Sequence, residues 1–194
     1  MGPKCVQCRK PIELAATGRP RRYCSGRCRV VAYRARQRKG KGGLSVPYEL
    51  TVLPRFVRHV HKRPVTVDGK QSSVTDPATW SSFDAATASM VGDGIGFVLG
   101  EGIGCIDLDD CFLPDGSLTV GAQKVLRLAD KTWVEISPSG RGLHVWGRLP
   151  EGPGRVRVFE GQKVETYSRA RYMTITGDLW DGAPLQLGPL PTLS

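Results

Sequence analysis

The chain has 194 residues, of which 40% are hydrophobic and 24% are charged, and its formal net charge is +10. This length suits one modest domain with a small appendage and excludes several full domains. The sequence has no apolar run of about 18 residues and no apolar stretch near its N-terminus, which excludes a transmembrane helix and a secretory signal. We therefore expect a soluble protein of the cytoplasm.

The positive charge is concentrated in the first segment of the chain. Residues 1–42 contain 13 lysines or arginines and one acid, which gives +12, whereas residues 43–194 carry −2. A basic arm on a nearly neutral body is typical of proteins that bind nucleic acid, although a merely solubilising surface has the same composition. The glycine-rich run at 39–43 marks a flexible boundary. We expect a basic module over 1–42 and a globular domain over 43–194.

Four cysteines in the basic segment are spaced in two pairs, Cys5-x-x-Cys8 and Cys24-x-x-x-Cys28. Without a secretory signal, such pairs indicate a metal site before they indicate disulfides. Four thiolates make a closed tetrahedral zinc site, and a module of this size needs the metal to fold. The alternative is that the four cysteines are unrelated buried residues. The sequence predicts one structural Zn²⁺.

The remainder of the chain indicates a mixed α+β fold. The expected elements, in chain order, are a turn at 75–80, a short helix capped by Ser82 or Asp84 and ending by Met90, strands at 94–100 and 104–109 joined by a glycine-rich turn, a surface helix at 119–130, strands at 133–137 and 143–146 around a tight turn, a further strand pair at 164–167 and 172–176, and an extended tail from about 179. Cys105 and Cys111 are isolated and are expected to be small core residues.

Two carboxylates, Asp107 and Asp109, end an apolar strand. Alternation along a strand places both on one face, while Ile106 and Leu108 point to the other face. Two neighbouring carboxylates repel each other, and a divalent cation that prefers oxygen ligands relieves the repulsion. Acids at a strand end are also common in caps and turns, and Asp110 and the pair at 115–116 are expected to be turn residues.

A second polar cluster surrounds the tight turn that begins at Ser137. This turn carries Ser139, Arg141 and His144 together with two glycines. Glycines allow backbone N–H groups to face an anion, the guanidinium offers paired donors and the imidazole adds another donor. Such a turn suits a triphosphate, although a glycine-rich hairpin with a structural histidine has the same pattern.

These motifs occur in the order seen in a known family. The segments around Asp107 and Asp109, the run from Glu135 to His144, and Glu165-x-Tyr167 followed by residues 171–177 resemble the primase-polymerase domain of phages and plasmids. This domain is a branch of the archaeo-eukaryotic primase superfamily. The resemblance covers about residues 50–178 and implies a primase-like core with an RRM-like catalytic sheet.

The resemblance also implies site residues and cofactors. Asp107, Asp109 and Glu165 match the carboxylates that hold two catalytic Mg²⁺ or Mn²⁺ ions. The matched nucleotide-binding residues are Ser139, Arg141 and His144, with Lys62, Arg63, Arg169 and Arg171 as further candidates for phosphate contact. The arginines of the basic arm are expected to hold single-stranded DNA: Arg27, Arg29, Arg34, Arg36 and Arg38.

The function implied is template-directed synthesis of primers or DNA from nucleoside triphosphates during replication of a mobile element in a bacterial cell. No helicase segment follows the domain, so unwinding is expected from a separate replicative helicase. Two alternatives remain open on the residues alone. One is a non-enzymatic, zinc-dependent DNA-binding protein with a degenerate core, and the other is a metal-dependent nuclease that uses the same carboxylates.

Overall fold

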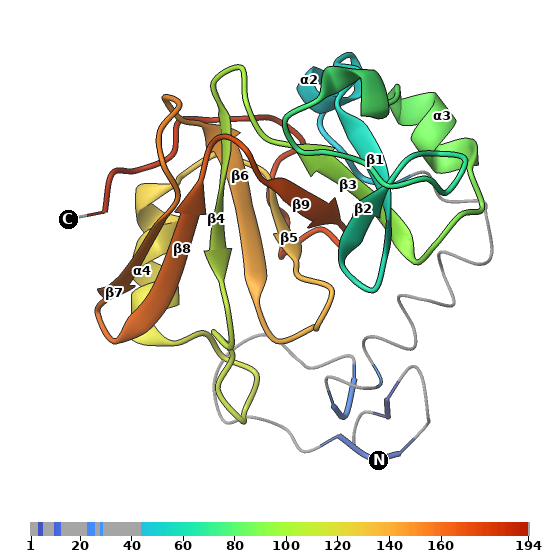
Figure 1. The fold of residues 1–194 in the computed structure, drawn as a ribbon. Helices are drawn as coiled ribbons and strands as arrows, with labels where there is room; N and C mark the ends of the chain where they lie inside the picture. The colour runs from blue at the N-terminus through green and yellow to red at the C-terminus, as the bar shows by residue number, and fades with distance from the viewer. Residues whose placement is uncertain (1–3, 6–9, 13–22, 26–27, 29–43, 194) are drawn as a thin grey trace.

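The computed structural model describes residues 4–5, 10–12, 23–25, 28 and 44–193. Within this part of the chain, nine strands form two antiparallel sheets (Figure 1). A four-stranded sheet has the order β2-β1-β3-β9, with β1 at Phe56–Val60, β2 at Arg63–Val65, β3 at Gly94–Val98 and β9 at Tyr172–Ile175. A five-stranded sheet has the order β5-β6-β4-β8-β7, with β4 at Ile103–Leu108, β5 at Val134–Ile136, β6 at Leu143–Arg148, β7 at Arg155–Phe159 and β8 at Gln162–Tyr167. The mixed α+β class is therefore confirmed.

The helices among the described residues are short, and two of them begin where the sequence predicts. The helices are α2 at Tyr48–Thr51, the 3-10 turn at Pro77–Thr79, α3 at Phe83–Ala88 and α4 at Val120–Leu128. Ser82 caps α3 by accepting a hydrogen bond from the backbone N–H of Ala85, and Thr119 caps α4 in the same way through Ala122. These hydroxyl caps satisfy N–H groups that the first helical turn leaves free.

One face of the five-stranded sheet packs against α4, which lies along β8 and β7 in Figure 1. Ile106 and Leu108 of β4 are fully buried there, in one hydrophobic cluster with Ala122 and Val125 of α4. Because side chains alternate along a strand, this packing turns Asp107 to the opposite face. The predicted placement of Asp107 opposite to Ile106 and Leu108 is confirmed, and Asp107 shares its face of β4 with the buried residues Ile103 and Cys105.

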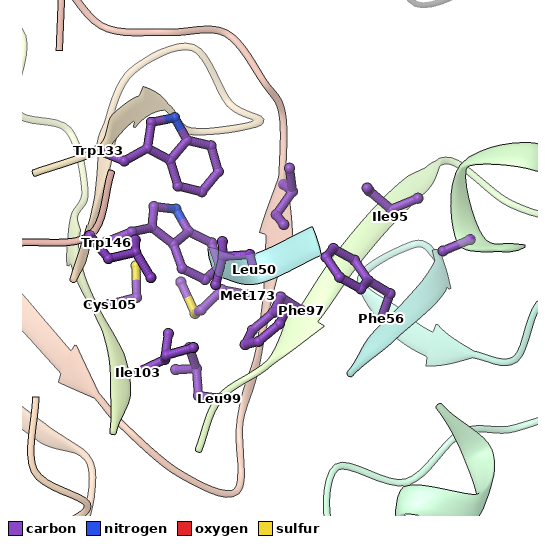
Figure 2. Packing of buried hydrophobic residues seen from close by; sticks show 13 residues of the cluster. Leu50, Phe56, Ile95, Phe97, Leu99, Ile103, Cys105, Trp133, Trp146 and Met173 are labelled. Carbon is purple, nitrogen blue, oxygen red and sulfur yellow. The ribbon is translucent and has the colours of Figure 1, made fainter. Parts of the chain in front are cut away.

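A second hydrophobic cluster joins the two sheets (Figure 2). The rings of Trp133 and Trp146 stack with centroids 5.3 Å apart, and Phe97 of β3 meets the Trp146 ring edge-on at 6.3 Å. Cys105 is fully buried in this cluster, as predicted. Cys111 is fully buried on the α4 side, where burial raises the pKa of its thiol to about 12.

The strand connectivity differs from the expectation in two places. The strands at 164–167 and 172–176 do not form a pair, because β8 pairs with β4 and β7 whereas β9 pairs with β3 in the other sheet. The strands on either side of the glycine-rich turn also lie in different sheets, with β3 in one and β4 in the other. Four observed elements were not predicted: β1, β2, β7 and α2. Strand β2 and helix α2 are only three and four residues long. The turn at Glu160-Gly161, which joins β7 to β8, was a signal in the sequence that the prediction did not use.

The tail from about residue 179 runs extended along the five-stranded sheet, as expected. The backbone of Arg148 exchanges hydrogen bonds with Gly188 and Leu190, and Leu187, Leu190 and Leu193 are buried. No helix among the described residues combines the length and the apolar character needed to cross a membrane.

Candidate active site

A row of polar side chains crosses the five-stranded sheet on the face that α4 leaves uncovered. Asp107 of β4 lies directly opposite His144 of β6 on one side and Glu165 of β8 on the other. Glu135 of β5 lies opposite His144 and extends the row. Residues directly opposed in an antiparallel pair share a face, so the four side chains project to the same side. Asp109 lies just beyond the end of β4, two residues after Asp107.

Asp107 is largely buried and incompletely satisfied. Its side chain is 15% exposed, and its Oδ1 atom is buried without a hydrogen-bond partner, 3.8 Å from His144 Nε2. Burial raises the pKa of this carboxyl group, and the negative charges of Asp109 and Glu165 raise it further, while His144 opposes them. A carboxylate oxygen that is buried and unsatisfied suits a hard divalent cation such as Mg²⁺ or Mn²⁺. The residues present therefore fit such an ion.

Glu165 is held by its neighbours on β8. Its Oε1 accepts a hydrogen bond from Lys163 Nζ at 2.5 Å, and its Oε2 accepts one from the Tyr167 hydroxyl at 2.6 Å. Both hydrogen bonds lower the pKa of the Glu165 carboxyl group, and the bond from Lys163 has the larger effect. Glu165 is thus a carboxylate with both oxygens engaged, and each oxygen keeps a second lone pair with which it could bind an ion.

The three predicted metal carboxylates share a face but do not converge tightly. Within the described residues, the ligand atoms of Cys5, Cys24 and Cys28 lie within 4.8 Å of one another. The carboxylate oxygens of Asp107, Asp109 and Glu165 are not all within this distance of one another. Side-chain rotation at Glu165 and Asp109 would have to bring their oxygens toward Asp107.

The predicted phosphate-binding turn lies beside the end of β4. The backbone N–H of Cys111 donates to the Arg141 carbonyl at 3.0 Å, and a Cβ atom at Gly142 would come within 2.4 Å of the Leu108 carbonyl. Only glycine therefore permits this approach. The Ser139 hydroxyl accepts from the Arg141 backbone N–H at 3.2 Å, and the exposed Arg141 guanidinium pairs with Asp110 at 2.7 Å.

Of the other predicted basic residues, Arg171 comes nearest to the acids. Its guanidinium lies 4.5 Å from the ring centroid of Tyr167, whose hydroxyl donates to Glu165. Its charge opposes the rise that burial causes in the pKa of Asp107, and it adds to the lowering that Lys163 causes in the pKa of Glu165. The Lys62 carbonyl accepts a hydrogen bond from the hydroxyl of Tyr172, the residue after Arg171. Arg63 and Arg169 are exposed.

The sequence analysis gave no role to Glu135, although the structure places it in the row. Glu135 is fully buried, and its Oε1 contacts His144 Nδ1 at 3.2 Å. The signal available in the sequence was an acid between Val134 and Ile136 on the strand predicted at 133–137. An acid at such a position requires partners, which are not visible in the sequence.

Three of the four predicted zinc ligands lie together. The Sγ atoms of Cys5, Cys24 and Cys28 are within 4.8 Å of one another, and those of Cys24 and Cys28 are 3.6 Å apart. Cys8 lies outside the described residues, as do the five arginines of the basic arm: Arg27, Arg29, Arg34, Arg36 and Arg38. Thiolates at this mutual distance suit a Zn²⁺ ion, which takes four ligands in a tetrahedral structural site.

We predict one tightly held zinc ion per chain. The physical reason is that three clustered thiols gain little from packing but bind Zn²⁺ strongly once they are deprotonated. Metal analysis of the purified protein tests this, with the Cys24→Ser/Cys28→Ser double variant as the comparison and Cys111→Ser, in the hydrophobic cluster beside α4, as the matched cysteine control. Zinc that persists in the double variant, or negligible zinc in the native chain, would contradict the site.

No protein-family model matches the chain. Among curated proteins, a DNA primase-polymerase of Nitratiruptor phage NrS-1 is 38% identical over 123 residues. The match covers 59% of this chain, and the chain spans only 17% of the length of that relative. The resemblance that the ordered motifs predict is therefore confirmed: 123 residues of this chain are similar to part of a phage DNA primase-polymerase.

Proposed function

We propose that this chain catalyses template-directed nucleotidyl transfer, so that it makes primers, extends DNA, or does both, during replication of a phage or plasmid. Its relative is named a DNA primase-polymerase, and the proposal carries that activity over to the matched part of this chain. The substrates would be a single-stranded DNA template and nucleoside triphosphates.

The observation that carries the proposal is the row of Asp107, Glu165 and His144 on one face of the five-stranded sheet. The unsatisfied Oδ1 of Asp107 lies in this row, next to the turn that carries Ser139 and Arg141. Carboxylates for metal ions and donors for phosphates thus lie side by side, which is the combination that phosphoryl transfer requires. We further propose that this sheet corresponds to the RRM-like catalytic sheet of the superfamily.

Asp107, Asp109 and Glu165 would hold two Mg²⁺ or Mn²⁺ ions. When bound, such ions make a hydroxyl a better nucleophile and stabilise negative charge on the phosphates. In the absence of an ion, Lys163 and Tyr167 hold the Glu165 carboxylate through a hydrogen bond to each of its two oxygens. Arg171, stacked on Tyr167, adds positive charge beside the acids, where a triphosphate would need it.

The turn residues Ser139, Arg141 and His144 would bind the nucleotide, with Lys62, Arg63 and Arg171 contributing positive charge. We predict that His144→Ala and Arg141→Ala weaken nucleotide binding more than template binding. A hydrogen bond to a charged group is worth roughly 1.5–3 kcal/mol, which corresponds to about ten- to a hundredfold in affinity. Equilibrium binding of a nucleoside triphosphate and of a single-stranded oligonucleotide measures both constants, with Arg127→Ala on α4 as a charge-matched control. Unchanged nucleotide affinity in both variants would remove the turn from the site.

The division into residues 1–42 and 43–194 also remains part of the proposal. The first part would be a zinc module whose arginines grip the template, and the second part would be the catalytic domain. A separate helicase would open the duplex, and the protein would act in the cytoplasm of the bacterial host.

One assay tests the proposed function against both alternatives. The protein is incubated with a single-stranded template, labelled nucleotides and Mn²⁺, with and without a labelled primer. Synthesis gives products longer than the primer, a nuclease gives products shorter than the input, and a binding protein gives neither. Products no longer than the input in both Mn²⁺ and Mg²⁺ would refute the proposal.

A further inference from the structure

Glu135 is a fully buried carboxylate with donors around both of its oxygens. Its Oε1 atom contacts His144 Nδ1 and accepts from Trp146 Nε1, each at 3.2 Å. Its Oε2 atom accepts from the backbone N–H and the hydroxyl of Thr176, at 2.8 and 2.9 Å, and from the backbone N–H of Gly177 at 2.8 Å. A buried carboxylate is tolerated only when it is satisfied in this way.

This arrangement determines which nitrogen of His144 faces the row of acids. Four other donor contacts converge on the two Glu135 oxygens, so His144 Nδ1 also faces an acceptor, and we take it to carry a hydrogen that it donates to Glu135. The imidazole is 4% exposed, and its ring meets the Trp146 ring edge-on at 6.4 Å, so it has little room to turn. The other nitrogen, Nε2, consequently lies on the side of Asp107, 3.8 Å from Oδ1.

The same carboxylate also joins the two sheets. His144 belongs to β6 of the five-stranded sheet, whereas Thr176 and Gly177 directly follow β9 of the four-stranded sheet. Strand β9 begins at Tyr172, next to Arg171. Glu135 therefore fixes the position of His144 relative to β9, the strand that follows Arg171. His144 and Arg171 thus approach the acids from different sheets.

We propose that Glu135 is a positioning residue for the nucleotide site, which holds the His144 ring with its Nδ1 hydrogen turned inward and Nε2 turned toward Asp107. This inference rests on the proposed function in that His144 is taken to contact the nucleotide. A competing explanation is that Glu135 serves only to hold the core together. The two explanations differ in what happens when the carboxylate becomes an amide.

The decisive variant is Glu135→Gln, which keeps the shape of the side chain. Three donors surround the Oε2 position, so the amide oxygen is expected to lie there and the NH₂ group to face His144. His144 Nδ1 must then accept, which moves the ring hydrogen to Nε2. Thr176→Val is the matched control, because it removes one hydrogen bond to the same carboxylate and leaves the His144 contact in place.

Nitrogen NMR of ¹⁵N-histidine-labelled protein reads the ring directly, since the chain has three histidines and His144→Ala assigns the signal. We expect a hydrogen on Nδ1 in the native chain and in Thr176→Val, and its loss from Nδ1 in Glu135→Gln. A native spectrum with no hydrogen on Nδ1 would overturn the proposal, and this measurement requires neither catalytic activity nor a folded Glu135→Gln variant.

Nucleotide binding in Ca²⁺, which is not expected to support turnover, separates positioning from core packing. Glu135→Gln should change the affinity for the nucleotide about tenfold, because it converts Nε2 of His144 from an acceptor into a donor, whereas Thr176→Val should change it less than about twofold at a comparable loss of thermal stability. The double variant Glu135→Gln/His144→Ala should bind no more weakly than His144→Ala alone, because Glu135 acts through His144. Additive losses, or equal losses in Glu135→Gln and Thr176→Val, would show that Glu135 acts only on the core. Absence of DNA synthesis by the native chain would instead refute the proposed function and leave the NMR result standing.

Discussion

Replacing Asp107 or Asp109 by alanine is expected to abolish DNA synthesis while the fold and single-strand binding remain intact. If these carboxylates hold catalytic ions, their loss removes several kcal/mol of transition-state stabilisation, which corresponds to a fall of at least about a thousandfold in rate. Primer extension under single-turnover conditions measures the rate, and Asp84→Ala, at an exposed position in the first turn of α3, controls for the loss of one negative charge.

The structure also predicts the effect of this substitution on stability. Asp107 lies in the interior with one oxygen unsatisfied, and burial raises the pKa of its carboxyl group, so the folded chain gains little from its charge. The thermal midpoint of Asp107→Ala should therefore equal or exceed that of the native protein. Extension at near-native rates would refute the metal assignment, and loss of activity together with a large fall in the midpoint would show a structural role.

Removal of residues 1–42 is expected to separate initiation from extension. The removed segment carries +12 and the remaining chain −2, so the shortened protein should hold a template weakly. Starting a strand requires a bare template and two nucleotides to be held together, whereas a primer duplex supplies part of this positioning during extension. The shortened protein should still extend a primer at low salt but scarcely start one.

Salt titrations test the physical basis of this prediction. Each phosphate contact that is lost should reduce the log-log salt slope of single-strand binding by about 0.7. A version of the full chain with the five arm arginines changed to glutamine, but with the cysteines intact, controls for loss of the zinc module. Undiminished initiation, or an equal loss of both activities in a folded truncation, would assign the segment another role.

The parts of the site that the sequence predicted are those that depend on local pattern. Alternation along one strand was enough to place Asp107 opposite to Ile106 and Leu108, and the hydroxyls of Ser82 and Thr119 marked helix starts. These features depend on residues within a few positions of each other, where steric preferences are strong.

The parts of the site that the sequence could not predict depend on strand pairing and contacts between segments that are distant in the chain. Glu135 accepts a hydrogen bond from Thr176, which lies 41 positions later in the chain. Strand β9 pairs with β3 and not with β8, the strand that precedes β9 in the chain. Such contacts are determined by how whole sheets pack, and many pairings of the same strands satisfy the same alternation of apolar and polar residues. For this reason the contacts of Glu135 with residues of both sheets could not be predicted from the sequence.

In the strand register of the five-stranded sheet, Asp107 lies directly opposite His144 and Glu165. This register determines where the chain can accept insertions and deletions. One residue inserted into β8 before Glu165 would shift the strand by one position and turn the carboxylate toward α4, where Val164 now packs. Insertions in the turn at 113–117 or in the connection at 149–154 would leave this alignment untouched. Evolution of related chains should therefore add and remove residues in those connections and preserve the length of β4, β6 and β8.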